Sequence, residues 1–81
     1  MLLKTNNLKD GSGPREVVVG IVTRDGNEEV IVSKRQVQNN LLAVSGVIGF
    51  ENSYALVELP RESTTGKWRV WVPQADVVEH T

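Results

Sequence analysis

The sequence predicts a mainly β fold: a small, partly open barrel of five strands with one short inserted helix. Short runs of β-branched and aromatic residues recur between clusters of Gly, Pro, Asn and Asp, which is the pattern of strands joined by turns. Apolar residues take helical spacing over residues 33–46, in the middle of the chain. An α+β fold, in which that helix covers an antiparallel sheet, is the alternative that the pattern leaves open.

Residues 1–14 are expected to form a flexible N-terminal arm, with residues 15–81 as a single β-rich domain. Residues 10–14, Asp-Gly-Ser-Gly-Pro, break regular structure because they include two glycines and a proline. The arm also has few apolar side chains to offset the entropy that a segment loses when it becomes ordered. In the alternative, the leucines of the arm pack on a neighbouring element; these are Leu2, Leu3 and Leu8.

The clearest predicted strand is Glu16–Thr23, a β-branched run followed by the turn signal Asp25-Gly26. Residues 29–32 then return as its hairpin partner. An antiparallel strand with one face in water should alternate apolar and polar residues. This strand carries apolar side chains on both faces, Val17, Val19 and Ile21 on one and Val18 and Val22 on the other. We therefore expect both faces to be at least partly covered, by a helix, a closed barrel or another subunit.

The inserted helix is expected over residues 33–46. Ser33 and Gln36 have the spacing of a capping box, in which each side chain satisfies a backbone N–H of the other residue. Apolar residues then recur at helical spacing, and a glycine follows as a stop signal. The pair Asn39-Asn40 leaves an alternative open, because asparagine is a poor helix former and favours turns.

The C-terminal half predicts three further strands, at Val47–Phe50, Tyr54–Leu59 and Lys67–Val72. Polar segments separate them, and a proline ends the second strand because it cannot donate a hydrogen bond to a ladder. Residues 73–78 are expected to form a single turn of helix that packs a valine against the mouth of the barrel.

The composition disfavours several classes of function. Nine basic and ten acidic residues give a net charge of −1, so nothing indicates attraction to nucleic acid or to a membrane surface. The chain has no cysteine and a single histidine, His80, so no disulfide, metal site or cofactor is expected. No apolar run long enough for a signal peptide or a membrane span begins at the N-terminus, which favours a cytoplasmic location.

A self-contained active site is not expected either. Nucleophilic catalysis needs a nucleophile, a base within reach and a group that orients the base. The paired carboxylates of the chain are Glu28 and Glu29, which point to opposite faces of a strand and are interpreted as solvated edge charges. The glycines lie at scattered turn-like positions and form no phosphate-binding loop. The sequence therefore assigns no catalytic residue.

Binding features are better represented. Alternation along the last strand places Trp68 on one face and Arg69 with Trp71 on the opposite face, toward which Tyr54 and Leu56 also point. Tryptophan and arginine are enriched at interface hot spots, and so small a core gains from further burial. These residues predict a non-enzymatic binding or assembly module that self-associates, or meets another protein, through this aromatic face. In the alternative, the inserted helix or the N-terminal arm covers Trp71.

Two other functions remain open. Single-stranded RNA or DNA could bind through Lys34, Arg35 and Arg69, with bases stacked on the aromatic side chains. Lys34 and Arg35 otherwise belong to a solvated helix face. In the third hypothesis, an oligomer builds a small-ligand or enzymatic site on its symmetry axis.

Residues 46–50 (Gly-Val-Ile-Gly-Phe), residues 54–58 (Tyr-Ala-Leu-Val-Glu) and the proline that leads into residues 74–78 carry a resemblance to a known class of folds. They resemble the last half of Src-homology-3-like small barrels, and in particular the tetrameric type II dihydrofolate reductases. That family carries Ser-Val-Gln-Ile-Tyr before the proline, whereas residues 68–72 here are Trp-Arg-Val-Trp-Val. The glutamine and the tyrosine of the reductase site are absent, so the resemblance implies a barrel fold without reductase activity.

Overall fold

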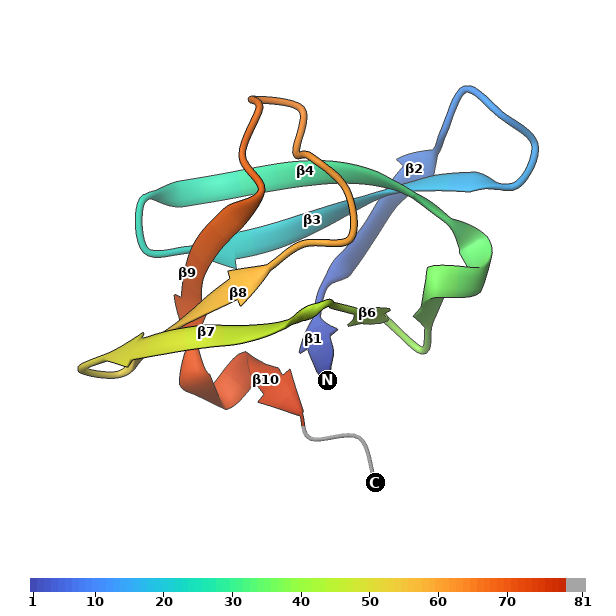
Figure 1. Cartoon of the computed structure of the whole chain (residues 1–81). Helices are drawn as coiled ribbons and strands as arrows, with labels where there is room; N and C mark the ends of the chain where they lie inside the picture. The colour runs from blue at the N-terminus through green and yellow to red at the C-terminus, as the bar shows by residue number, and fades with distance from the viewer. Residues whose placement is uncertain (79–81) are drawn as a thin grey trace.

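The fold is mainly β, which confirms the predicted class, in a computed structural model that describes residues 1–78 (Figure 1). The strands are β1 (Leu2–Lys4), β2 (Asn6–Asp10), β3 (Glu16–Thr23), β4 (Gly26–Ser33), β5 (Val37–Gln38), β6 (Leu41–Ala43), β7 (Gly46–Glu51), β8 (Tyr54–Glu58), β9 (Arg69–Pro73) and β10 (Val77–Val78). They form three antiparallel sheets with the strand orders β10-β1-β6-β5, β2-β3-β4 and β7-β8-β9. Two 3₁₀ turns complete the fold, η1 (Lys34–Gln36) and η2 (Gln74–Asp76).

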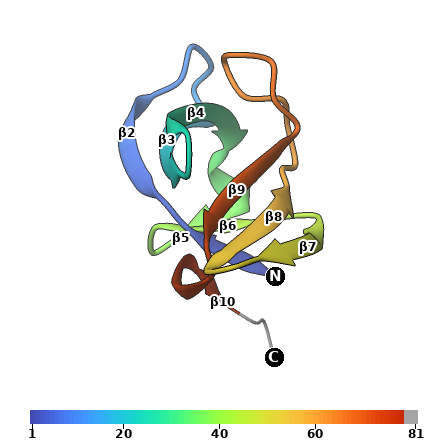
Figure 2. The same cartoon turned by 90° about the vertical axis from the view of Figure 1, so that its left-hand side faces the viewer.

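The three sheets surround one apolar core without joining into a closed barrel over residues 1–78. Figure 2 shows β2, β3 and β4 on one side of the molecule and β7, β8 and β9 on the other, with the short strands below them. All three sheets contribute buried side chains to the core: Leu3, Val17, Val19, Ile21, Val30, Val32, Val37, Leu42, Val44, Ala55, Val57, Leu59, Val70 and Val72.

The β3–β4 hairpin is the longest pairing, and its turn lies at the predicted place, where Gly26 has a φ of +121° that suits glycine. The expectation that both faces of β3 are covered holds for part of the strand. Away from the core, Val18 is buried, whereas Val22 is 51% exposed. Leu8 of β2 packs on the same outer side, against Gly20, where an added Cβ atom would come within 3.2 Å of Leu8 Cδ1.

The N-terminal segment differs from the expected flexible arm, because residues 1–14 contain both β1 and β2. β1 lies between β6 and β10 and pairs with both, and its central residue Leu3 is fully buried. β2 pairs with β3 through a register shift between Asn7 and Lys9. This segment is held by main-chain hydrogen bonds to the flanking strands and by the burial of one leucine. A low count of apolar residues therefore does not predict that the segment is disordered.

The prediction of a helix over residues 33–46 is wrong, because this stretch forms η1 followed by the β5–β6 hairpin. The capping box is present, with Gln36 Oε1 accepting from the Ser33 N–H at 3.0 Å, but it caps only a three-residue 3₁₀ turn. Asn39 and Asn40 have φ values of 54° and 61° and form the loop of the hairpin. Tight hairpin turns require positive φ at both central residues, which asparagine tolerates. The turn alternative is therefore the one observed, and the α+β fold with a covering helix has no such helix among the described residues.

The third sheet ends in the predicted helical turn. Pro73 closes β9, η2 follows it, and β10 then pairs with β1 across the start of the chain. Val77 packs against the core from this strand, as expected for a valine at the open end of the sheets. His80 lies outside the described residues.

Over residues 1–78, the structure contains no helix with the length and the hydropathy needed to cross a membrane.

The buried position of β1 leads to a stability prediction. Leu3→Ala should lower the free energy of unfolding by about 2–5 kcal/mol, because it removes a fully enclosed side chain and leaves a cavity. Leu8→Ala is the matched control, since Leu8 is 50% exposed. Urea denaturation followed by circular dichroism measures both changes. Equal losses in the two variants would contradict the position of β1 in the core.

Candidate aromatic interface on the third sheet

The β7-β8-β9 sheet has one face in the core and one face turned away from it. Ala55 and Val57 of β8 pair with Val72 and Val70 of β9, and all four side chains are buried. Because successive residues of a strand point to opposite faces, their sequence neighbours point outward. We call this surface the outer face; it consists of Gly49, Glu51, Tyr54, Leu56, Glu58, Arg69 and Trp71.

The centre of the outer face is apolar. Gly49, Leu56 and Trp71 are direct cross-strand partners on β7, β8 and β9, and Tyr54 lies one step further along β8. Leu56, Trp71 and Tyr54 are all half-buried rather than enclosed. A Cβ atom added at Gly49 would meet no other atom within 4 Å, so the surface above Gly49 is open. The predicted residues Tyr54, Leu56 and Trp71 are thus brought together on one surface.

Arg24, in the β3–β4 turn, extends this surface. Its backbone N–H donates to the Trp71 carbonyl at 2.8 Å, which ties the turn to β9. Its guanidinium carbon lies 5.0 Å from the centre of the Trp71 ring and 5.9 Å from the centre of the Tyr54 ring. These are cation–π distances. The Nη1 atom of the same group also lies 3.4 Å from Glu51 Oε1.

A second ion pair closes the opposite end of the outer face. Arg69 Nη2 lies 3.3 Å from Glu58 Oε2, and the two residues are cross-strand partners on β9 and β8. Both side chains are well exposed, so the pair itself adds little to stability. The apolar centre of the outer face therefore lies between two ion pairs, each with one positive and one negative group.

Trp68 does not join this cluster. It precedes β9, is 54% exposed, and lines a separate hollow of about 470 Å³ that also contains Ile31 and Arg61. The two indoles therefore lie on different surfaces, and neither is enclosed in the core.

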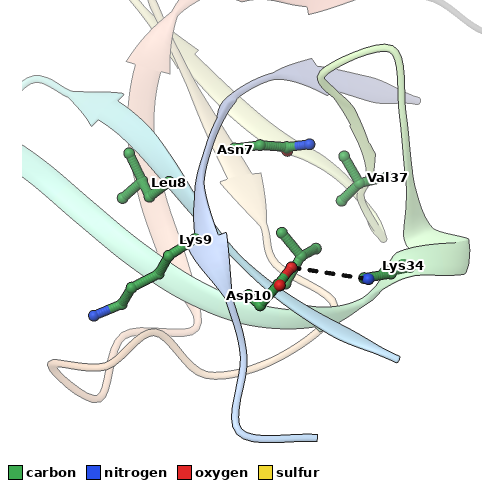
Figure 3. A pocket seen from close by; sticks show the side chains of 7 residues that line it. Asn7, Leu8, Lys9, Asp10, Lys34 and Val37 are labelled. Atoms are coloured by element: carbon green, nitrogen blue, oxygen red, sulfur yellow. Dashed lines mark ion pairs between the residues drawn. The ribbon is translucent and has the colours of Figure 1, made fainter. Parts of the chain in front are cut away.

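Lys34 and Arg35 are also separate from the aromatic residues. Lys34 borders a hollow of about 570 Å³ beside β2, where its Nζ lies 3.8 Å from Asp10 Oδ1 (Figure 3). Arg35 borders another hollow, together with Leu41. Both belong to η1, which lies at the opposite end of the molecule from the β3–β4 turn (Figure 1). A single path for a nucleic-acid strand over these cations and Trp71 is thus not assembled within one protomer.

The interpretation of Glu28 as a solvated charge is wrong, although Glu28 and Glu29 do point to opposite sides. Glu28 is only 8% exposed and anchors the loop between β8 and β9. Thr65 Oγ1 donates to Glu28 Oε1 at 2.5 Å, and Lys67 Nζ lies 3.5 Å from Glu28 Oε2. The hydrogen bond from Thr65 is the largest influence that lowers the pKa of Glu28 below its ordinary 4.5; burial opposes it, and Ser63 and Lys67 reinforce it.

Three charged residues of the outer face and its border were not singled out from the sequence: Arg24, Glu51 and Glu58. Glu58 could have been found, because alternation places it on the same face as Leu56. Arg24 could not, since the turn that carries it meets β9 only through tertiary structure. Across residues 1–78, no three His, Cys, Asp or Glu side chains gather in a group that could hold a metal ion.

The chain matches no family model, no curated protein and no solved structure. Its function has to be inferred from the geometry of its own residues.

The buried carboxylate predicts a pH dependence of stability. Because folding lowers the pKa of Glu28, its contribution is present above pH 4.5 and is lost as the pH falls through the lower pKa of the folded state. Glu28→Gln should cost about 1–3 kcal/mol at neutral pH, and this cost should shrink in acid. Urea unfolding at several pH values measures it, with Glu29→Gln as the exposed neighbouring control. A cost for Glu28→Gln that stays constant across the pH range would contradict the prediction.

Proposed function

We propose that this chain is a non-enzymatic binding or assembly module that self-associates through the outer face. The observation that carries the proposal is the apolar centre of Tyr54, Leu56 and Trp71, which residues 1–78 leave half-buried. Aromatic side chains at the centre of a surface are the usual anchors of protein interfaces. A second copy laid on this face would remove these side chains from water.

The charges around the centre also favour a second copy. The outer face and its border carry two arginines, Arg24 and Arg69, and two glutamates, Glu51 and Glu58, each paired within the protomer. A polar rim around an apolar centre is the usual anatomy of an interface. Because the opposite charges balance, two identical faces can approach without the repulsion that a face of one sign would cause.

Two further apolar side chains are exposed on β7, an edge strand of its sheet. Ile48 is 48% exposed and Phe50 is 67% exposed. Natural edge strands are commonly protected by charges, prolines or bulges, and β7 ends in Glu51 and has a register shift between Val47 and Gly49. Because Phe50 is the cross-strand partner of the buried Ala55, it points to the side opposite the outer face, and its area is not part of the proposed contact.

The finer description as a partly open, Src-homology-3-like barrel of five strands also remains a proposal. The 3₁₀ turn η2 directly after Pro73 supports it, because those folds have such a turn at the equivalent place. A shared fold of this kind would not specify a function, since small barrels host many unrelated ones.

The other hypotheses stay predictions. No specific observation favours binding of single-stranded nucleic acid through Lys34, Arg35 and Arg69, a ligand site on a symmetry axis or a cytoplasmic location.

Sedimentation velocity tests the proposal directly. We expect the wild-type chain to form a dimer or a larger species at micromolar concentration. Trp71→Ala should weaken this association by about 2 kcal/mol or more, as for an interface hot spot. Trp68→Ala is the matched control, because Trp68 lies on another surface and its loss should leave the association unchanged. A monomeric wild type would remove the proposal.

Gly49→Lys provides a second test that spares the fold. The added side chain enters open space, so circular dichroism and thermal unfolding should change little. The same side chain places bulk and charge next to Leu56, where a second copy would pack. We expect a folded monomer from Gly49→Lys, and undiminished self-association of this variant would refute the assignment of the outer face.

A further inference from the structure

The guanidinium group of Arg24 occupies a place on the outer face that has the composition of a cation-binding site. Two aromatic rings face it, that of Trp71 at 5.0 Å and that of Tyr54 at 5.9 Å. A carboxylate, Glu51, lies 3.4 Å from Nη1, and a second one, Asp25, lies 3.9 Å from Nε. Aromatic faces and carboxylates together attract cations that are only weakly hydrated.

We propose that Tyr54, Trp71 and Glu51 form a binding site for the guanidinium group of an arginine side chain supplied by a partner polypeptide, and that Arg24 fills this site in the free protomer. The site is complete in one protomer, so the inference goes beyond self-association and does not depend on it.

The structure holds the rings in place without Arg24. Tyr54 and Trp71 lie on adjacent strands whose alternate residues are buried in the core, so their orientation follows from the sheet. Glu51, on β7, is the cross-strand partner of Tyr54. Removal of the Arg24 side chain therefore leaves the backbone positions of Tyr54, Trp71 and Glu51 unchanged. The backbone hydrogen bond from Arg24 to Trp71 also survives any side-chain substitution.

Arg24 competes with an incoming arginine for the site and can be displaced from it. Its side chain is 36% exposed, and its partner Glu51 is 59% exposed, so the contact is open to solvent. An exposed cation–π contact contributes only about two- to fivefold in affinity, which an incoming arginine with further contacts can exceed. While Arg24 occupies the rings, the apparent affinity for an external guanidinium falls in proportion to the fraction of free sites.

The test uses N-acetyl-arginine amide as the probe and the fluorescence of Trp71 as the signal, in a Trp68→Phe background that silences the other indole. N-acetyl-citrulline amide, which has the same shape but no charge, is the control ligand. We expect saturable binding of the arginine probe to the Arg24→Ala variant with a dissociation constant on the order of tens of millimolar. The same probe should bind about three- to sixfold more weakly to the chain that retains Arg24.

Two further variants make the result specific. Arg61→Ala in the Arg24→Ala background removes an ion-paired arginine that lies outside the outer face, so it should leave the affinity unchanged. Glu51→Gln in the Arg24→Ala background should weaken binding, because it removes the carboxylate. The inference is overturned if Arg24→Ala binds the arginine probe no better than the chain that retains Arg24, or if citrulline and arginine bind equally.

Sedimentation of the same variants shows whether the arginine is supplied by a second copy of this chain or by another polypeptide. If the probe dissociates an oligomer as it binds, the guanidinium comes from a second copy; if it binds without changing the assembly, the guanidinium belongs to another polypeptide. A monomeric wild type with saturable arginine binding would support the cation site and refute only the proposed self-association.

Discussion

The constraint on which this structure depends is the period-two alternation of β8 and β9. One set of alternate residues, Ala55, Val57, Val70 and Val72, closes the core against the other two sheets. The remaining set must then point away from the core, whatever its chemistry. Within residues 1–78 no second layer covers this set, so Leu56 and Trp71 stay partly in contact with water. The candidate interface is a consequence of how the core is closed.

The position of the β3–β4 turn adds chemistry to that surface. The hydrogen bond from the Arg24 N–H to the Trp71 carbonyl joins the second sheet to the third. It also brings a guanidinium over the rings of Trp71 and Tyr54. A buried carboxylate of β4, Glu28, also fixes the β8–β9 loop, through Thr65 and Lys67. The outer face is thus held by tertiary contacts at both ends, which makes its side chains a defined surface.

The sequence predicts the strands β3, β4, β7, β8 and β9, and it misses those within residues 1–14 and 33–46. β-Branched runs located β3 and its turn, and the alternation of β9 separated Trp71 from the core, because both signals are local. The helix over residues 33–46 failed because helical spacing and a capping box also fit a 3₁₀ turn followed by a hairpin, and positive φ at Asn39 and Asn40 decides between them. The burial of Leu3 and Glu28 depends on distant segments, which no local pattern reveals.

The most direct measurement of the central claim is a dilution series followed by the indole N–H signals in two-dimensional NMR. The chain has two tryptophans, which Trp68→Phe assigns unambiguously. If the outer face is a contact surface, the Trp71 signal shifts or broadens as the concentration rises, while the Trp68 signal stays constant. Signals that are both independent of concentration, or a change at Trp68 alone, would contradict the account.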